Sequence, residues 1–137
     1  MVKILAWLQT VVLGGNGLVM LFAGLWWYGV VPGVPLTGPY NPHFVRDIGA
    51  AYLVCGGAHA WLALKGRAAW PALVAAAAFL ILHAAIHVFD AVCGTRPFAD
   101  LARDFGGVFV PAFIALGLAV WQAPPSSREM RHAEMAA

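Results

Sequence analysis

Long apolar runs divide this chain into four segments, separated by short polar or Gly/Pro-rich stretches. The apolar segments cover residues 4–31, 44–64, 69–93 and 105–122. A helix needs about 20 mostly apolar residues to cross the hydrocarbon core of a bilayer, and a slightly shorter helix is accommodated at its ends. The pattern therefore predicts an all-α, polytopic membrane protein with a four-transmembrane-helix bundle.

The stretches between these segments predict the connections. Residues 32–43 hold four prolines, residues 65–67 form a tight turn, and residues 94–104 form a polar loop. Two prolines at 124 and 125 end the last helix. We expect one transmembrane domain at 1–122 and a polar cytoplasmic tail at 123–137. The proline-rich stretch is either a plain connector or a stiff lid over one end of the bundle.

Composition supports a lipid environment. Hydrophobic residues make up 62% of the chain and charged residues 10%, with a mean hydropathy of +0.79. A soluble domain has about a quarter of its residues charged. A net charge of +2 without a basic stripe argues against nucleic acid as a partner. The lipid bilayer is the expected partner, and the open possibilities for a protein partner are a second copy and another subunit of a membrane complex.

Basic residues are distributed unequally between the two sides of the predicted bundle. One side carries Lys3, Lys65, Arg67, Arg128 and Arg131, and the other carries Arg46, Arg96 and Arg103. Because the more basic side of a membrane protein faces the cytoplasm, both termini are predicted to be cytoplasmic. The expected location is the inner (plasma) membrane of a bacterium. The four aspartates then lie on the outer side: Asp47, Asp90, Asp100 and Asp104.

One four-residue phrase occurs twice, each time before an apolar run: Arg46-Asp47-Ile48-Gly49 and Arg103-Asp104-Phe105-Gly106. Either the chain contains two parallel helix-pair repeats, or the match is a coincidence between apolar segments. An aspartate in the first turn of a helix is favoured by the helix dipole. Cross-pairing of each arginine with the other copy's aspartate would clamp the two helices together. We expect these four charged residues and His43 to form the ligand-binding rim of an outward-facing polar site.

Histidines provide the candidate chemistry. His83, His87 and Asp90 follow the spacing i, i+4, i+7, which places them on one face of a helix. Two imidazoles and a carboxylate are competent ligands for a transition metal or a haem iron, and His43 could complete the set. The alternatives are a polar ligand pocket without metal and a hydrogen-bond ladder between helices. His59 and Asn16 lie at similar predicted depths, and we expect them to bond to each other.

Other sequence signals are absent. The two cysteines, Cys55 and Cys93, lie in different segments and form no Cys-x-x-Cys motif. The chain contains no phosphate-binding loop, no dinucleotide fingerprint and no Gly-x-Ser-x-Gly motif. A thioredoxin-like protein, a zinc ribbon and a disulfide-relay enzyme therefore have no support in the sequence.

In layout the chain resembles small DoxX-like and uncharacterised bacterial membrane proteins. The shared features are four helices, a Gly/Pro loop after the first helix, and small residues in the second and third. The resemblance covers the whole chain and implies a four-helix membrane fold. It transfers no functional residues, because no diagnostic motif matches residue by residue.

The leading functional hypothesis is a small integral membrane protein with an outward-facing polar His/Asp/Arg site that binds a ligand, a metal or a partner subunit. The second hypothesis is a metal- or haem-dependent membrane redox enzyme with His83 and His87 as ligands. The third is a purely structural accessory subunit. We expect binding rather than catalysis.

Overall fold

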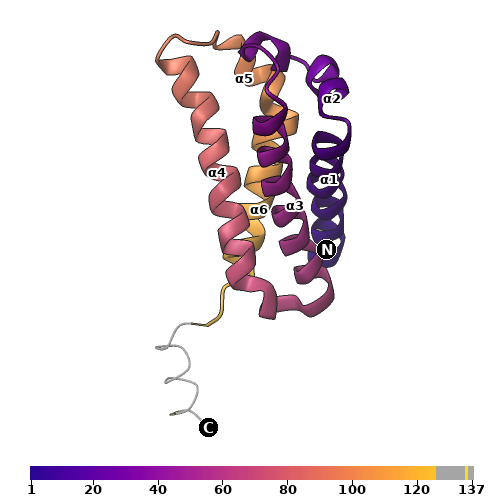
Figure 1. Cartoon of the computed structure of the whole chain (residues 1–137). Helices are drawn as coiled ribbons and strands as arrows, with labels where there is room; N and C mark the ends of the chain where they lie inside the picture. Colours follow the sequence, from indigo (N-terminus) through magenta and orange to yellow (C-terminus); the bar gives the residue numbers. More distant parts are fainter. Residues whose placement is uncertain (126–134, 136–137) are drawn as a thin grey trace.

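The computed structural model describes residues 1–125 and residue 135, and these residues form helices and connecting turns without any β-strand. The long helices are α1 (Val2–Phe22), α3 (Pro42–Lys65), α4 (Trp70–Val92) and α6 (Val110–Trp121). They run up and down beside one another, and the short helices α2 (Gly24–Val30) and α5 (Ala99–Asp104) lie together at one end (Figure 1). The predicted all-α class is confirmed. The tail predicted at 123–137 lies mostly outside the described residues.

Three helical stretches are long and apolar enough to cross a membrane: Val2–Phe22, Pro42–Val92 and Ala99–Trp121. The second stretch contains a reversal, the 3₁₀ turn η2 (Gly66–Ala69), after which α4 runs back beside α3 (Figure 1). The chain is thus a multi-pass membrane protein by helix length and composition. The predicted segments 44–64 and 69–93 fall almost entirely within α3 and α4.

Local sequence explains where α3 begins and ends. The Asn41 side chain accepts hydrogen bonds from the backbone N–H groups of His43 and Phe44, both at 3.1 Å. Pro42 occupies the first helical turn, where its missing N–H costs nothing. Gly66 ends the helix with φ +60°, a conformation that other residues adopt at a cost.

The first predicted segment, 4–31, is not one continuous helix. The chain leaves the helical conformation at Ala23 (φ −132°, ψ 36°), and α2 follows as a separate turn. The break lets the indole N–H of Trp27 donate to Asn16 Oδ1 at 2.8 Å. It also sets Gly24 against the hydroxyl of Tyr40, where a Cβ would lie 3.1 Å away. These tertiary contacts replace the regular helix that apolar periodicity predicts.

The last segment also differs from the prediction. Helix begins at Ala99, inside the stretch predicted as the loop 94–104, and passes through the π turn η3 (Phe105–Phe109) before α6. Pro111 lacks the N–H that an α-helix would use at this point, and the Val110 N–H bonds to the Phe105 carbonyl five residues back. A proline inside the apolar run thus explains the local change of helix type.

The closest packing joins α1 and α3 and depends on glycine. A Cβ at Gly17 would lie 2.6 Å from the Gly49 carbonyl oxygen, and a Cβ at Gly56 would lie 2.8 Å from the backbone nitrogen of Gly14. Small residues allow this approach, which is how helices associate in lipid. Large buried side chains fill the remaining core, namely Leu13, Met20, Leu62, Leu73 and Leu80.

Buried polar groups tie the helices by single hydrogen bonds. Gln9 on α1 donates to the Pro111 carbonyl at 2.7 Å, and the Trp70 indole on α4 donates to the Ala119 carbonyl at 2.9 Å. The predicted pair of His59 and Asn16 does not form. His59 Nδ1 lies 2.8 Å from the Cys55 carbonyl of its own helix, and Asn16 accepts instead from Trp27.

Candidate functional site

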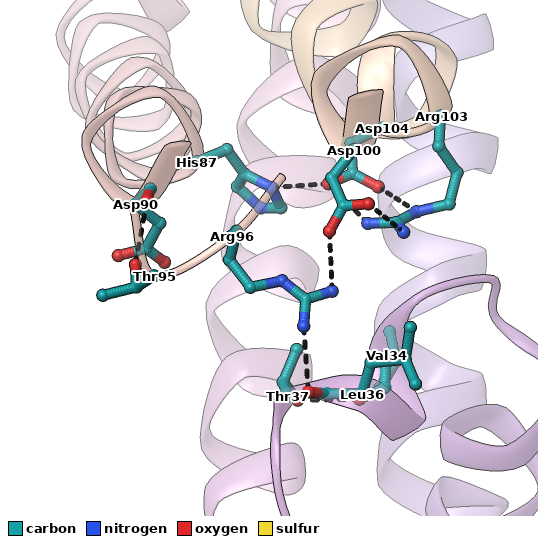
Figure 2. A network of polar contacts seen from close by, with 10 residues as sticks. All are labelled: Val34, Leu36, Thr37, His87, Asp90, Thr95, Arg96, Asp100, Arg103 and Asp104. Carbon is teal, nitrogen blue, oxygen red and sulfur yellow. Dashed lines mark hydrogen bonds and ion pairs between the residues drawn. The ribbon is translucent and has the colours of Figure 1, made fainter. Parts of the chain in front are cut away.

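Five charged or titratable side chains form a connected polar network at the end of the bundle that carries α2 and α5 (Figure 2). We call this set the polar network: His87, Arg96, Asp100, Arg103 and Asp104. Its members come from the end of α4, the connection that follows, and α5. The two arginines and two aspartates balance in charge, so the net charge of the network depends on His87.

Asp104 connects α5 to α4. Its Oδ2 lies 2.9 Å from Nδ1 of His87, and its Oδ1 accepts from Nε of Arg103 at 2.9 Å. The Asp104 side chain is 13% exposed, against 28% for His87. Because a carboxylate accepts, Nδ1 of His87 carries a hydrogen, and in the neutral ring Nε2 is then the hydrogen-bond acceptor or metal-ligating atom. The carboxylate thus fixes which nitrogen of His87 is available.

The network continues to the proline-rich loop. Asp100 accepts from Nη1 of Arg103 at 2.7 Å and pairs with Nη2 of Arg96 at 2.8 Å. Nη1 of Arg96 donates to the Leu36 carbonyl at 2.9 Å (Figure 2). That carbonyl belongs to the 3₁₀ turn η1 (Val34–Thr37). The loop therefore covers the network, which agrees with the lid interpretation better than with a plain connector.

Glycine makes the fit between loop and network possible. Gly33 has φ +87°, and a Cβ at this position would overlap the guanidinium of Arg103. The loop is also held from its other side, because the Tyr28 hydroxyl donates to the Gly38 carbonyl and the Tyr28 ring packs edge-on against Tyr40 at 5.4 Å between centroids. The loop thus packs against α5 in a defined position.

His83 lies one turn below the network within a set of aromatic rings. Its ring centroid is 5.0 Å from that of His87, 6.0 Å from Tyr52 and 6.2 Å from Phe79. Phe109 follows on the other side of His87 at 6.4 Å. Within the described residues His83 makes no side-chain hydrogen bond within the protein. Ring packing positions its imidazole, and no described group hydrogen-bonds to either of its ring nitrogens.

The other predicted rim residues do not join this network. His43 and Asp47 pair with each other at 3.4 Å on the first turns of α3, with side chains 88% and 60% exposed. Arg46 is exposed as well. The predicted cross-clamp is wrong, because Arg103 binds Asp100 and Asp104 of its own helix, and Asp47 binds His43. Of the five predicted rim residues, the structure brings Arg103 and Asp104 into the network.

Asp90 also departs from the predicted ligand set. It lies at the end of α4, where its backbone carbonyl accepts from the N–H groups of Thr95 and Arg96 and from the Thr95 hydroxyl (Figure 2). His87 turns toward Asp104 instead. In residues 1–125 no group of three or more His, Cys, Asp or Glu side chains is arranged to hold a metal ion. The predicted trio of His83, His87 and Asp90 is therefore not assembled.

The two copies of the repeated phrase adopt different local structures. Residues 46–49 lie in regular α-helix, and residues 103–106 cross from α5 into the π turn. Gly49 packs against α1, where a Cβ would lie 2.8 Å from the Met20 Cβ, but a Cβ at Gly106 would meet nothing within 4 Å. The same phrase thus performs two different structural tasks.

Sequence reasoning missed Arg96 and Asp100 as members of the site. Their spacing of i, i+4 was visible, and so was the i, i+3 spacing of Asp100 and Arg103, which are pairings typical of a helix. The interpretation of residues 94–104 as a loop concealed both signals. The contact with Leu36 had no sequence signal, because it uses a backbone carbonyl.

Comparison of the chain with family models, with curated proteins and with solved structures found no match in any of the three.

Proposed function

We propose that the chain crosses the inner membrane of a bacterium four times, with both termini in the cytoplasm. The 24 residues of α3 and the 23 residues of α4 are each long enough for a separate crossing, in addition to α1 and to the 23 residues of Ala99–Trp121. By sequence, five of the eight Lys and Arg residues lie before the first span, in the turn between α3 and α4, or after the last span, and this distribution supports the orientation. A relationship to small DoxX-like proteins is part of the same proposal and rests on layout.

At the outer end we propose a binding site for a small ligand, centred on His83 and His87. The observation that carries this proposal is the hydrogen bond of 2.9 Å between His87 Nδ1 and Asp104 Oδ2, directly beside a His83 ring that makes no hydrogen bond with the described residues. Ionisable side chains within a membrane-spanning helix are costly, and they usually face the bundle interior or a water-filled cavity and mark a functional site. A carboxylate behind an imidazole is the usual way to orient that imidazole toward a ligand.

The chemistry of the site favours a ligand that offers a hydrogen-bond donor or an open coordination position. Nε2 of His87 and one ring nitrogen of His83 supply acceptors, and the other nitrogen of a neutral His83 supplies a donor. Tyr52, Phe79 and Phe109 supply apolar ring surface. The loop seated on Arg96 and Arg103 would cover the bound ligand. Binding of a metal ion remains within this proposal as a two-histidine site completed by ligands from outside the protein.

The redox-enzyme alternative receives less support. Non-haem iron oxygenases hold their iron with two histidines and one carboxylate, and the described residues supply no such group. His83 and His87 lie on the same helix with ring centroids 5.0 Å apart, so they cannot bind opposite faces of one haem. A purely structural role predicts instead that the two histidines contribute stability and nothing else.

The proposal is tested by identifying what remains bound to the purified protein. Detergent-purified protein is measured by metal analysis, optical spectroscopy and mass spectrometry of extracted small molecules. We expect a stoichiometric bound component in the wild-type protein and in His43→Ala, whose imidazole is exposed, and its loss from the double variant His83→Ala/His87→Ala. Wild-type protein without a bound component, or a double variant with unchanged content, would contradict ligand binding at this site.

A further inference from the structure

At the opposite end from the polar network, α4 and α6 enclose an apolar groove of about 440 Å³. Ala77 and Ala119, both nearly buried, form its floor. Ile81, Leu116 and Val120 stand along its length as walls. The groove exists because alanines lie where the two helices would otherwise fill the space with larger side chains.

The largest side chain in the groove lining, Trp70, has no free polar group. Trp70 lies at the end of the groove nearest the α3–α4 turn, and its indole N–H is used by the Ala119 carbonyl at 2.9 Å. The ring therefore contributes apolar surface alone. A groove of this kind suits a flexible hydrocarbon chain.

A second hollow of about 500 Å³ adjoins the groove and is different in character. Arg67, Ala123, Pro124 and Pro125 line it, and Ala123 also lines the groove. Arg67 is exposed and lies in η2, the turn between α3 and α4 at the lower end of the bundle (Figure 1). The apolar groove therefore leads into a space with a guanidinium at its edge.

We propose that this composite surface binds an anionic phospholipid, with one acyl chain in the α4–α6 groove and the phosphate at Arg67. A guanidinium matches phosphate in charge and in bidentate geometry. Basic pockets between transmembrane helices on the cytoplasmic side are typical sites for anionic lipid headgroups. The proposal rests on the membrane orientation proposed above but not on the histidine site.

Charge favours a lipid over another occupant of the groove. A second copy of the chain or another transmembrane helix would also cover apolar surface, but its binding would not depend on Arg67. A phospholipid uses both features. Its acyl chain needs the apolar groove, and its phosphate needs a cationic side chain at the end of that groove.

Native mass spectrometry of protein released from vesicles tests the proposal. The vesicles contain phosphatidylcholine and phosphatidylglycerol in equal amounts, so the two headgroups compete for the same groove. We expect one tightly retained phosphatidylglycerol per protein. Arg67→Gln should lower the preference for phosphatidylglycerol about fivefold, the usual effect of one basic residue at a membrane surface, and Lys3→Gln, a basic residue outside both hollows, should leave it unchanged.

A second pair of variants tests the groove itself. Ala78→Phe fills the groove from an exposed position, and Ala75→Phe adds the same ring to an exposed position of α4 outside the lining. We expect Ala78→Phe alone to release both lipids, with the thermal midpoint unchanged in both variants. Equal retention of the two lipids by the wild-type protein, or a preference unaffected by Arg67→Gln, overturns the proposal. A lipid-free dimer that Ala78→Phe dissociates would assign the groove to a second copy.

The lipid proposal and the histidine-site proposal can be refuted independently of each other. His83→Ala/His87→Ala should retain phosphatidylglycerol like the wild-type protein, because neither residue lines the groove or the hollow at Arg67. Loss of lipid specificity would leave the proposed histidine site unaffected.

Discussion

Asp47 and Asp104 have the same neighbours in sequence, an arginine before and a glycine two residues after, yet their surroundings differ. Asp104 is 13% exposed and bonds to both Arg103 and His87, but Asp47 is 60% exposed and has one contact with His43 at 3.4 Å. This difference in burial should make their contributions to stability different. An ion pair in water contributes little to the free energy of unfolding. Breaking a partly buried pair leaves polar groups that water cannot fully satisfy.

Replacement of Asp104 should therefore be costly. Asp104→Asn keeps the shape of the side chain but removes the charge that pairs with Arg103 and orients His87. We expect a loss of about 2 kcal/mol in the free energy of unfolding, measured by thermal unfolding in detergent. Asp47→Asn, the matched control from the other copy of the phrase, should change stability by less than about 0.5 kcal/mol. Equal losses for the two variants would contradict the network as described.

At the scale of elements, close backbone approach and one proline decide how the helices pack. The α1–α3 pair uses glycines at the points of nearest approach, where lipid gives no hydrophobic drive toward association. The π turn η3 precedes Pro111 and changes the direction in which the residues of α5 point. The polar network thus depends on a helix irregularity as well as on its own side chains.

Two glycine-to-alanine substitutions in α3 should distinguish the effect of helix packing on stability from the effect of helix propensity. Gly49→Ala places a methyl group 2.8 Å from the Met20 Cβ, so α1 must shift, and we expect a loss of roughly 1–3 kcal/mol. Gly57→Ala meets nothing within 4 Å in the same helix and should be neutral or stabilising by about 0.5–1 kcal/mol. Thermal unfolding of both variants in one detergent measures the difference. A stable Gly49→Ala protein would show that α1 and α3 are less tightly packed than described.

The loop of residues 32–41 should become less ordered when the guanidinium of Arg96 is removed. Arg96→Met keeps much of the length of the side chain but cannot donate to the Leu36 carbonyl or pair with Asp100. We expect faster hydrogen–deuterium exchange across Val34–Thr37, with exchange in α1 unchanged. Lys65→Met removes a charge at the other end of the bundle and serves as the control. Unchanged exchange in the loop would mean that Tyr28 and Tyr40 hold it without Arg96.

At the scale of the whole molecule, the two ends of the bundle differ in chemistry. One end holds the polar network, the loop and α2, and the other holds the α3–α4 turn, Arg67 and the start of α1 (Figure 1). Histidines and aspartates dominate the first end, and an apolar groove with a basic edge marks the second. The proposed ligand site and the proposed lipid site therefore lie toward opposite ends of the bundle.

Cysteine labelling in intact cells tests this arrangement. Cys93 is exposed and is first replaced by serine, and buried Cys55 is left in place. In that background we expect Thr37→Cys to react with an impermeant maleimide from outside the cell, because the proposed orientation places this loop outside. Ala68→Cys, in the α3–α4 turn, should react only after the cells are lysed. Labelling of Ala68→Cys in intact cells would invert the orientation and move both proposed sites to the other side.

The sequence by itself determined the helical class, the approximate positions of α3 and α4, and the gathering of aspartates at one end. These follow from hydropathy and from Asn41, Pro42 and Gly66, which act within a few residues of themselves. Tertiary structure decided the break at Ala23, the partner of His87 and the contact of α5 with the proline-rich loop. Each depends on contacts between residues far apart in the chain, such as Arg96 with Leu36 and Gly33 with Arg103. Local pattern cannot encode such contacts, because it specifies which side chains share a helix face but not which other element that face meets.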